Sequence, residues 1–387
     1  MAKMLTRLRA VAAKIEAAEG VAESLSASDA SFDVYEPRFN PNVPYFKRDP
    51  ARSSLSPLPG LPGPKAGAIT FGVEVKGSGA AATAPGFSKL LRACGMIEID
   101  PWKLSKPGGD WSGAFTAGER VTQATSGAIG IVMFATAATE DLWVIPVSGT
   151  FDNTNTVTGA ESSSAGIPSA AAQSVAIGWR PGSGSTVPSL TIGGYFDGIR
   201  HVLRGARGNV TLAAVRGEVV RLNFEFTGIY DPTTDVALIS ASPDSTIPPV
   251  ALGMALKLQG GYDAIFQQLS INLQNQVVER ENASKAVGIE SFLITGRAPQ
   301  MTVDPEQELV ATHDFYGKLR AGTQGRMEFQ VADPTPVAGN RFRIGAPATQ
   351  YVQVSDDDRT AKSVAGLTMD LTSKDTAGND ELVLLSY

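Results

Sequence analysis

Cysteine, histidine and long apolar runs are scarce in this sequence, and each scarcity excludes a class of protein. The single cysteine, Cys94, excludes an intrachain disulfide framework and a cysteine-rich metal site. Nothing around the two widely separated histidines, His201 and His313, suggests a histidine metal site or a Ser/His/Asp triad. No stretch reaches the roughly 20 apolar residues of a membrane span. We therefore expect no metal, no other cofactor and no contact with a membrane.

A basic excess is also missing, because the formal net charge is −6 and the pI is about 5.2. A chain with this balance has no overall positive field with which to bind nucleic acid through counterion release. What the sequence does contain is 43% hydrophobic residues, 19% charged residues, 40 glycines and 24 prolines. This composition favours a globular protein with much β structure and many turns, and 387 residues allow two or three domains.

Residues 1–65 predict a helix followed by an extended arm. Residues 3–24 space their apolar side chains as on one stripe of an amphipathic helix. Charged residues interrupt that stripe, so it does not predict a secretion signal, and we expect synthesis in the cytoplasm. Residues 25–67 are rich in Ser, Asp and Pro and predict an extended arm. We expect four aromatic residues of this arm to contact another subunit: Tyr35, Phe39, Tyr45 and Phe46.

A strand and a short helix are predicted after the arm. In "AITFGVEVKG" the apolar residues alternate with polar ones from Ile69 to Val75, which is typical of a strand with one buried face. The next segment, "APGFSKLLRACGM", has Pro85 near a helix start and Gly95 at its end. Cys94 falls on the apolar side of this helix, so we interpret it as a core residue and not as a reactive thiol.

Residues 109–168 contain an internal β repeat. "GAFTAGERVTQATSGAIG" begins at Gly113 and "GTFDNTNTVTGAESSSAG" begins at Gly149, an offset of 149 − 113 = 36 residues. Four residue pairs keep the same register: Phe115/Phe151, Val121/Val157, Thr122/Thr158 and Gly130/Gly166. The low charge and the abundance of Ser, Thr and Gly predict a small inserted module that faces outward. Its host domain is then formed by residues 66–108 together with residues 169–245.

The stretch "LRGARGNVTLAAVRGEVVRLNFEFTG", residues 203–228, combines arginines with glycines and then alternates as a strand. It lacks the glycine spacing of phosphate-binding loops, and a strand follows it instead of a helix. We therefore interpret the arginine-glycine part as a loop between strands. Its arginines are expected to pair with carboxylates of an adjacent subunit while the glycines permit the turn: Arg204, Arg207 and Arg216.

Residues 246–387 consist of further strand-like runs interrupted by one predicted helix. That helix is expected to begin with Asp304 as its N-cap and Pro305 at its first position, and to end at Gly322. "ESFLITGRAP" with the following "GKLRAGTQG" resembles "ITFGVEVKG" with "SKLLRACG", with Lys318 and Lys89 equivalent. The order of strand and helix favours a duplication of one β-sandwich domain with a packed helix.

The remaining candidate chemistry is weak, and we expect no enzyme. The run Asp356 to Asp358 lacks the alternating ligands of a calcium loop and is interpreted as a solvated turn. Five carboxylates are candidates for glycoside chemistry, but side chains of this kind usually form the wet face of a strand: Glu74, Glu98, Asp197, Glu218 and Glu225. Aromatic residues, at 7%, form no ladder for stacking sugars or bases.

The segments quoted so far, in their order, resemble tail tube proteins of tailed bacteriophages. The likeness covers most of residues 60–105 and 174–387, and its most specific part is "FDGIRHVLRGARGNVTLAAVRGEVVRLNFEFTGIYD", with "GIESFLITGRAP" and "NDELVLLSY" as further elements. The resemblance implies a mainly β subunit with two tandem β-sandwich domains, residues 66–245 and 246–387, each with a packed helix. The repeat at 113–168 departs from the plain tube domain.

The same resemblance implies a function. Subunits join through their sheets into rings, and rings stack into a hollow tube that conducts DNA during ejection without sequence-specific binding. The implied partners are further copies, as trimeric rings if the halves are true repeats and hexameric rings otherwise, and tail proteins such as the tape measure, terminator and distal tail proteins. The implied location is the virion tail, of the long non-contractile kind. The alternatives are a tube subunit of a contractile or secretion machine and a β-rich surface binding module.

Overall fold

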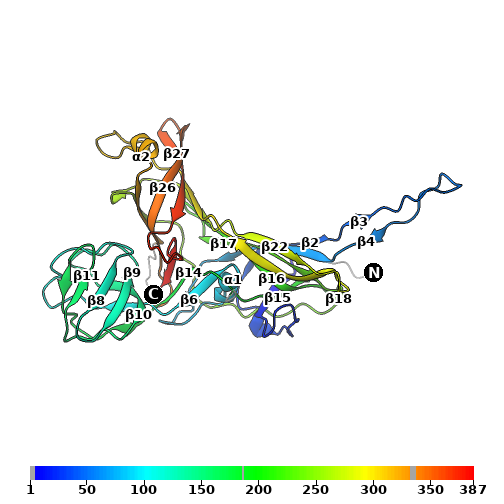
Figure 1. Ribbon diagram of the computed structural model, residues 1–387, viewed down its shortest axis with the longest axis horizontal. Helices are drawn as coiled ribbons and strands as arrows, with labels where there is room; N and C mark the ends of the chain where they lie inside the picture. The colour runs from blue at the N-terminus through cyan, green and yellow to red at the C-terminus, as the bar shows by residue number, and fades with distance from the viewer. Residues whose placement is uncertain (1–4, 185–186, 332–336) are drawn as a thin grey trace.

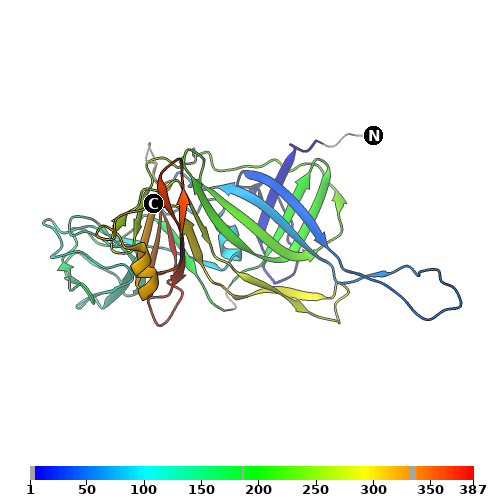
Figure 2. The same ribbon diagram turned by 90° about the horizontal axis from the view of Figure 1, so that it is seen from above.

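Strands far outnumber helices in the structure, which confirms the prediction of a mainly β fold. The computed structural model describes residues 5–184, 187–331 and 337–387. The molecule is elongated: a separate β module lies at one end, a thin hairpin extends from the other, and helix α2 projects to the side with strands β26 and β27 (Figure 1). The view from above shows the same hairpin standing clear of the body (Figure 2).

The body is one continuous sheet to which the parts of the chain before and after the module contribute. The part before residue 245 supplies β1 (Arg9–Ile15), β2 (Val34–Asn42), β5 (Ala66–Glu74), β6 (Met96–Ile99), β14 (Ile177–Pro181), β15 (Leu190–Phe196), β16 (Ile199–Val215), β17 (Arg221–Tyr230) and β18 (Thr234–Asp235). The later part supplies β19 (Ala255–Leu258), β20 (Tyr262–Asp263), β21 (Gln268–Asn272), β24 (Gln300–Val303), β25 (Gln324–Val331), β26 (Phe342–Asp358), β27 (Ser363–Thr372) and β28 (Val383–Ser386). Two hairpins form sheets of their own: β3 (Tyr45–Phe46) with β4 (Leu61–Pro62), and β22 (Gln276–Glu281) with β23 (Ile289–Gly296).

Within this sheet, two four-stranded units have the same order. In the first unit β2 pairs with β5, β5 with β17, and β17 with β16. In the second unit β21 pairs with β24, β24 with β27, and β27 with β26. The two units join where Thr211–Val215 of β16 pair with Gln268–Asn272 of β21. All of these pairings are antiparallel. Because β16 and β21 join the two units, the eight strands form one surface.

One face of the eight strands forms the main hydrophobic core. Ile69, Phe71 and Val73 point inward from β5, and Leu222, Phe224 and Phe226 oppose them from β17. Buried residues continue this layer through the second unit: Val210, Leu212, Leu269, Ile271, Met301, Val303, Leu367 and Met369. Strict alternation fixes the register, because a slip of one residue would expose the whole apolar set.

Two short helices cover parts of this core. Helix α1 (Ser88–Ala93) buries Leu90 and Leu91, and Cys94 at its end is fully buried, which confirms the core interpretation. Burial raises the pKa of the Cys94 thiol well above its usual value. Helix α2 (Phe315–Ala321) ends at Gly322, in the left-handed conformation, as predicted.

The predicted start of α2 was wrong. The N-cap is Asp314, whose Oδ1 accepts a hydrogen bond from the backbone N–H of Gly317 at 2.7 Å. Asp304 instead accepts bonds from the backbone N–H groups of Gln267 and Gln268, ahead of a loop. Asp and Pro also favour turns, so an Asp-Pro pair does not by itself define a helix start.

The predicted N-terminal helix over residues 3–24 was also wrong, as far as the described residues show. Arg9–Ile15 form β1, which pairs with β15 along its whole length. Val11 and Ala13 face the main core, whereas Ala10 and Ala12 contact a second apolar cluster around Tyr195. Small residues fit between two apolar layers, and this tertiary packing overrides the helix propensity of alanine.

The module is a seven-stranded sheet with its own core, and it spans residues 102–174. Its strands are β7 (Trp102–Leu104), β8 (Arg120–Gln123), β9 (Ala128–Val132), β10 (Leu142–Ser148), β11 (Val157–Gly159), β12 (Ala165–Gly166) and β13 (Gln173–Ser174). The sequence repeat is visible in the packing: Thr122 pairs directly with Thr158, and Phe115 and Phe151 are both core residues. The module's sheet boundaries are thus wider than the predicted 109–168.

The arginine-glycine stretch is not a loop, which corrects the sequence interpretation. Residues 199–215 form the single long strand β16, with a register shift between Arg204 and Arg207. Gly205 takes a positive φ of 60° there, and Gly208 leaves a Cβ position only 2.3 Å from the carbonyl oxygen of Glu225. The glycines therefore permit a bulge and a close strand pairing instead of a turn.

Candidate functional site

The largest feature that the core does not use is the second face of the eight strands, which we call the polar face. One row of residues in register crosses it from Tyr35 on β2 through Gly72, Asn223 and Thr211 to Asn272 on β21. The row continues through Gln300, Asp370 and Gln350. Amide and hydroxyl side chains thus follow one another across neighbouring strands.

Hydrogen bonds between neighbouring strands order these amide side chains. Asn209 Nδ2 donates to Asn272 Oδ1 at 2.8 Å across the junction between the two units. Gln300 Nε2 donates to Asp370 Oδ1 at 3.0 Å, and Gln274 Nε2 donates to Gln300 Oε1 at 3.1 Å. Side chains that bond one another present a fixed polar surface to the solvent.

Charges on the polar face are few and of mixed sign. Four arginines and four carboxylates point to this side of the eight strands, and Arg204 and Arg207 among them are paired with Asp231 and Glu19: Arg38, Arg204, Arg207, Arg221, Glu74, Glu225, Asp357 and Asp370. Tyr35 lies 4.3 Å beneath the Arg221 guanidinium and donates its hydroxyl to Glu74, which raises the pKa of Tyr35 to about 12. No lysine lies on the face within these strands, all of which the structure describes. Such a surface has no positive field to hold a polyanion.

The predicted arm is shorter than expected, and half of its aromatics belong to the body. Val34–Asn42 are part of the main sheet, so only residues 43–65 leave it. Phe39 stacks on His201 with ring centroids 4.3 Å apart, and Tyr35 packs on Arg221. These two residues therefore contact their own chain.

Tyr45 and Phe46 lie on the projecting hairpin, which we call the arm. Their exposed fractions are 62% and 57%, and no residue between 41 and 65 is buried. The hydroxyl of Tyr45 accepts a hydrogen bond from the N–H of Gly60 at 2.6 Å, which holds the two strands of the arm together. Figure 1 shows that the arm extends well beyond the body. Exposed aromatics on such an element are typical of a segment that binds another molecule.

Two of the three singled-out arginines have partners within the chain. Arg207 is 6% exposed, with Nη1 2.6 Å from Glu19 Oε1 and donating to the carbonyl of Phe292, and with Nη2 donating to the carbonyl of Val187 at 3.0 Å. The guanidinium of Arg204 binds Asp231 at 2.9 Å and the carbonyl of Gly20 at 2.6 Å. Both arginines thus hold the N-terminal segment on the sheet.

Arg216 lies exposed in the turn between β16 and β17. Arg207 follows the bulge in β16 and keeps the register of Asn209, so its side chain points to the polar-face side, where contacts with Glu19, Val187 and Phe292 bury it.

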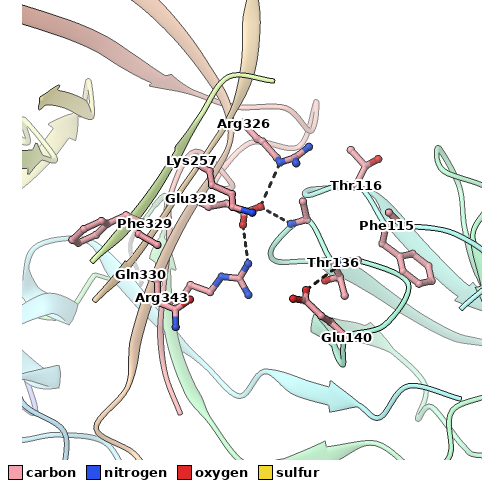
Figure 3. A pocket seen from close by; sticks show the side chains of 14 residues that line it. Phe115, Thr116, Thr136, Glu140, Lys257, Arg326, Glu328, Phe329, Gln330 and Arg343 are labelled. Carbon is pink, nitrogen blue, oxygen red and sulfur yellow. Dashed lines mark hydrogen bonds and ion pairs between the residues drawn. The ribbon is translucent and has the colours of Figure 1, made fainter. Parts of the chain in front are cut away.

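A cleft of about 420 Å³ separates the module from the body (Figure 3). Glu328 of β25 lies at its centre, 2.7 Å from Nη2 of Arg343 and 3.5 Å from Nε of Arg326. The same carboxylate accepts a hydrogen bond from the N–H of Ala135 in the module at 2.7 Å. Arg343 also covers the ring of Phe134 at 4.2 Å. Glu328 and Arg343 of the cleft are therefore engaged in docking the module.

The five carboxylates considered for glycoside chemistry lie on different elements. Glu74 accepts from Tyr35, Glu98 from Ser88, and Asp197 from the N–H of Leu5. Glu218 is in the turn after β16 and Glu225 is on the polar face. Among the described residues, no group of three or more His, Cys, Asp or Glu side chains could hold a metal ion. No helix in the described ranges is long and apolar enough to cross a membrane.

The sequence reasoning missed the polar face as a site. Asn209, Asn272, Gln300 and Asp370 each stand in a short alternating run, such as "GNVTLAAV" or "LSINLQN". The signal that could have found them is the repeated choice of amides and hydroxyls over Lys and Glu at the outward positions. Comparison with protein-family models finds no match, and comparison with curated proteins finds no similar sequence.

Proposed function

We propose that this chain is a structural protein of a phage tail, which polymerises as stacked rings into a hollow tube that conducts DNA during ejection. The observation that carries the proposal is the polar face, which crosses eight strands backed by the main core and is covered by the β22–β23 hairpin near Ala66 and Ile229. A surface of this extent is much wider than a binding site for a small molecule. As the wall of a channel, it would present water-binding groups along the whole path.

The charge of the polar face supports a conduit for DNA. Duplex DNA binds proteins mainly through phosphate contacts with Lys and Arg, which release counterions. Arg204 and Arg207 are neutralised by Asp231 and Glu19, and Arg38 and Arg221 lie among four carboxylates. These arginines cannot supply such binding, so DNA would slide past amides and hydroxyls. The net negative charge of the whole chain likewise disfavours the binding of DNA phosphates.

The matching order of the two four-stranded units supports two tandem tube-type sandwich domains. In this proposal β2–β5–β17–β16 and β21–β24–β27–β26 are equivalent, and helices α1 and α2 pack on the corresponding units. Three chains would then form a ring with pseudo-sixfold symmetry. Tape measure, terminator and distal tail proteins would be the partners at the ends and inside of the tube.

The arm supports stacking between rings. Its exposed aromatics contact no other part of the body, and its length takes it beyond the outline of the subunit (Figures 1 and 2). We assign Tyr45 and Phe46 to a contact with the neighbouring ring. Burying two such side chains at an interface stabilises association by about 2–4 kcal/mol.

Negative-stain electron microscopy with mass photometry over a concentration series tests the proposal. We expect rings or tubes with a central hole, and a mass per ring of three chains. Y45A/F46A should lower the number of stacked rings while the folded monomer remains. V147A/I167A removes two similarly exposed apolar residues from the module and serves as the matched control. A protein that stays monomeric at every concentration, with or without other tail proteins, would contradict the proposal.

A further inference from the structure

Strands β16 and β26 occupy equivalent positions in the two units. Each is 17 residues long. One edge of β16 pairs first with β18 and then with β17, and the corresponding edge of β26 pairs first with β28 and then with β27. The other edge begins with β15 in the first case and with β25 in the second. The two long strands thus have the same set of neighbours.

They differ at one place. On β16 the edge beyond β15 is taken by β21, which pairs with Thr211–Val215. On β26 the pairing with β25 stops at Gln350, and no described strand pairs with the same edge from residue 351 to residue 358. This segment is largely exposed, and Val352 is 42% exposed. An open strand edge of this length is a ready template for another strand.

The strand that would fill this position is identified by the matching order of the units. In the first unit the counterpart of β21 is β2, since both lie at the outer end of their four strands. Among the described strands, β2 pairs with β5 only, so its outer edge is open. Pro37 and Pro41 are in β2, and proline in a sheet is confined to edges and bulges.

We propose that β2 of a second copy pairs antiparallel with residues 351–358 of β26, as β21 pairs with β16 within the chain. The inference rests on the proposed function, and it names the two edges that would join subunits in a ring. Because β2 and β26 lie at opposite ends of the eight strands, the contact is head-to-tail, the kind of contact from which closed rings are built. It continues the polar face from one subunit to the next without a break.

The register follows from equivalent rows on the polar face. We align the two units at the last pair of β5 with β2, Val73 with Val34, and the last pair of β24 with β21, Val303 with Leu269. Thr302, which faces Ser270 and Thr368, then stands in the place of Gly72, which faces Tyr35 and Asn223. Gln353 faces Thr368 as Thr211 faces Asn223, so Gln353 takes the place of Thr211.

The partner of Gln353 follows in the same way. Thr211 pairs with Asn272, which faces Gln300. In the first unit Thr70 stands in the place of Gln300 and faces Arg38. Gln353 is therefore opposite Arg38 of the second copy. Both side chains are exposed in the single chain, so neither loses a buried partner when replaced.

Disulfide trapping with R38C/Q353C tests this pairing. The two positions lie at opposite edges of one subunit, so the bond can form only between copies. Under mild oxidation in conditions that assemble, we expect most chains in covalent multimers, whereas R38C or Q353C alone stays monomeric on a denaturing gel. N223C/Q353C is the matched control, because Gln353 keeps its place on the β26 edge whereas Asn223 lies on β17, two strands away from the β2 edge. The native Cys94 is fully buried and does not interfere.

The outcomes separate this inference from the proposed function. Covalent multimers that also appear as rings or tubes by electron microscopy support both. Rings or tubes whose R38C/Q353C chains remain uncrosslinked, or crosslink no more than the control, overturn the strand pairing and leave the tube proposal in place. Absence of any assembly, with all chains uncrosslinked, overturns both.

Discussion

At the scale of single residues, Arg207 and Arg216 are expected to behave in opposite ways. R207A removes a buried guanidinium and leaves Glu19 and the carbonyls of Phe292 and Val187 without their donor. We expect the free energy of unfolding to fall by about 2–4 kcal/mol. R216A, at an exposed turn, should change it by less than about 0.5 kcal/mol. Urea unfolding of the two variants measures the difference, and equal stabilities would show that the Arg207 contacts contribute little.

His313 gives the folded chain a residue-scale dependence on pH. It is 5% exposed, its Nε2 is 2.9 Å from the Tyr351 hydroxyl, and Tyr262 stacks on it at 4.4 Å. Burial, reinforced by the charge of Lys318, lowers the pKa of His313 to about 4. Since the folded state disfavours the proton, this contribution to stability is complete above about pH 6.5 and is lost as the pH falls towards 4.

We therefore expect H313Q to flatten the pH dependence of unfolding. Between pH 6.5 and pH 4 the wild-type protein should lose about 1–3 kcal/mol more than H313Q does, because the carboxylates titrate alike in both. Chemical unfolding at several pH values measures the two slopes. Identical slopes would mean that His313 takes up a proton as easily in the folded chain as in the unfolded chain.

At the scale of elements, Glu328 fixes the module to the body. In E328A, Arg326 and Arg343 lose their shared carboxylate and the N–H of Ala135 loses its acceptor. We expect tryptic cleavage near Lys103 and Lys106 to become about tenfold faster, which corresponds to about 1.4 kcal/mol of local opening. E161A, which removes the more exposed pair with Lys374, is the control and should change little. An unchanged rate in E328A would show that apolar contacts alone hold the module.

Sequence patterns correctly predicted the elements that local residues determine. They failed where tertiary contacts determine whether a segment forms a helix or a strand. The strand at 66–74 and the stop of α2 at Gly322 are local features, and both were found. The Ala-rich run at 9–15 has helix propensity, but its place between two apolar clusters makes it a strand. "ESFLITGRAP" was matched to the strand before a helix, whereas that position in the sheet belongs to β24 and the matched residues lie mostly in β23 of the β22–β23 hairpin. Alternation of apolar and polar residues predicts that a segment is a strand, but it does not predict which strand it pairs with.

At the scale of the whole molecule, the property to test is that the polar face lacks the excess of positive charge needed to bind DNA. The variant N209K/N272K/Q300K adds three positive charges in neighbouring strands of this face. We expect assembled tubes of the variant to retain linear duplex DNA at 50 mM salt and to release it towards 200 mM, while wild-type tubes retain none at either concentration. Lysines at Ala124, Thr125 and Ser169, exposed on the module, are the control for net charge. Wild-type tubes that bind DNA as well as the triple variant would contradict a non-adhesive wall.

The polar face could not be read from the sequence because its members are distributed over eight strands. Asn209 and Asn272 are 63 positions apart, yet they share a hydrogen bond. Each run showed alternation, but which runs are neighbours is decided by pairings such as β16 with β21, which no local pattern encodes. The arm was easier to predict, since proline-rich composition is itself local.

Strands β7 and β13, at which the chain enters and leaves the module, are paired with each other: Trp102 faces Ser174 and Lys103 faces Gln173. The module therefore interrupts the body at a single point, and its ends need to span almost no distance. Loop closure at this point costs the body little whatever is inserted. A different folded domain whose ends lie equally close could take its place, and the subunit would then carry foreign cargo at regular intervals along any polymer that it forms.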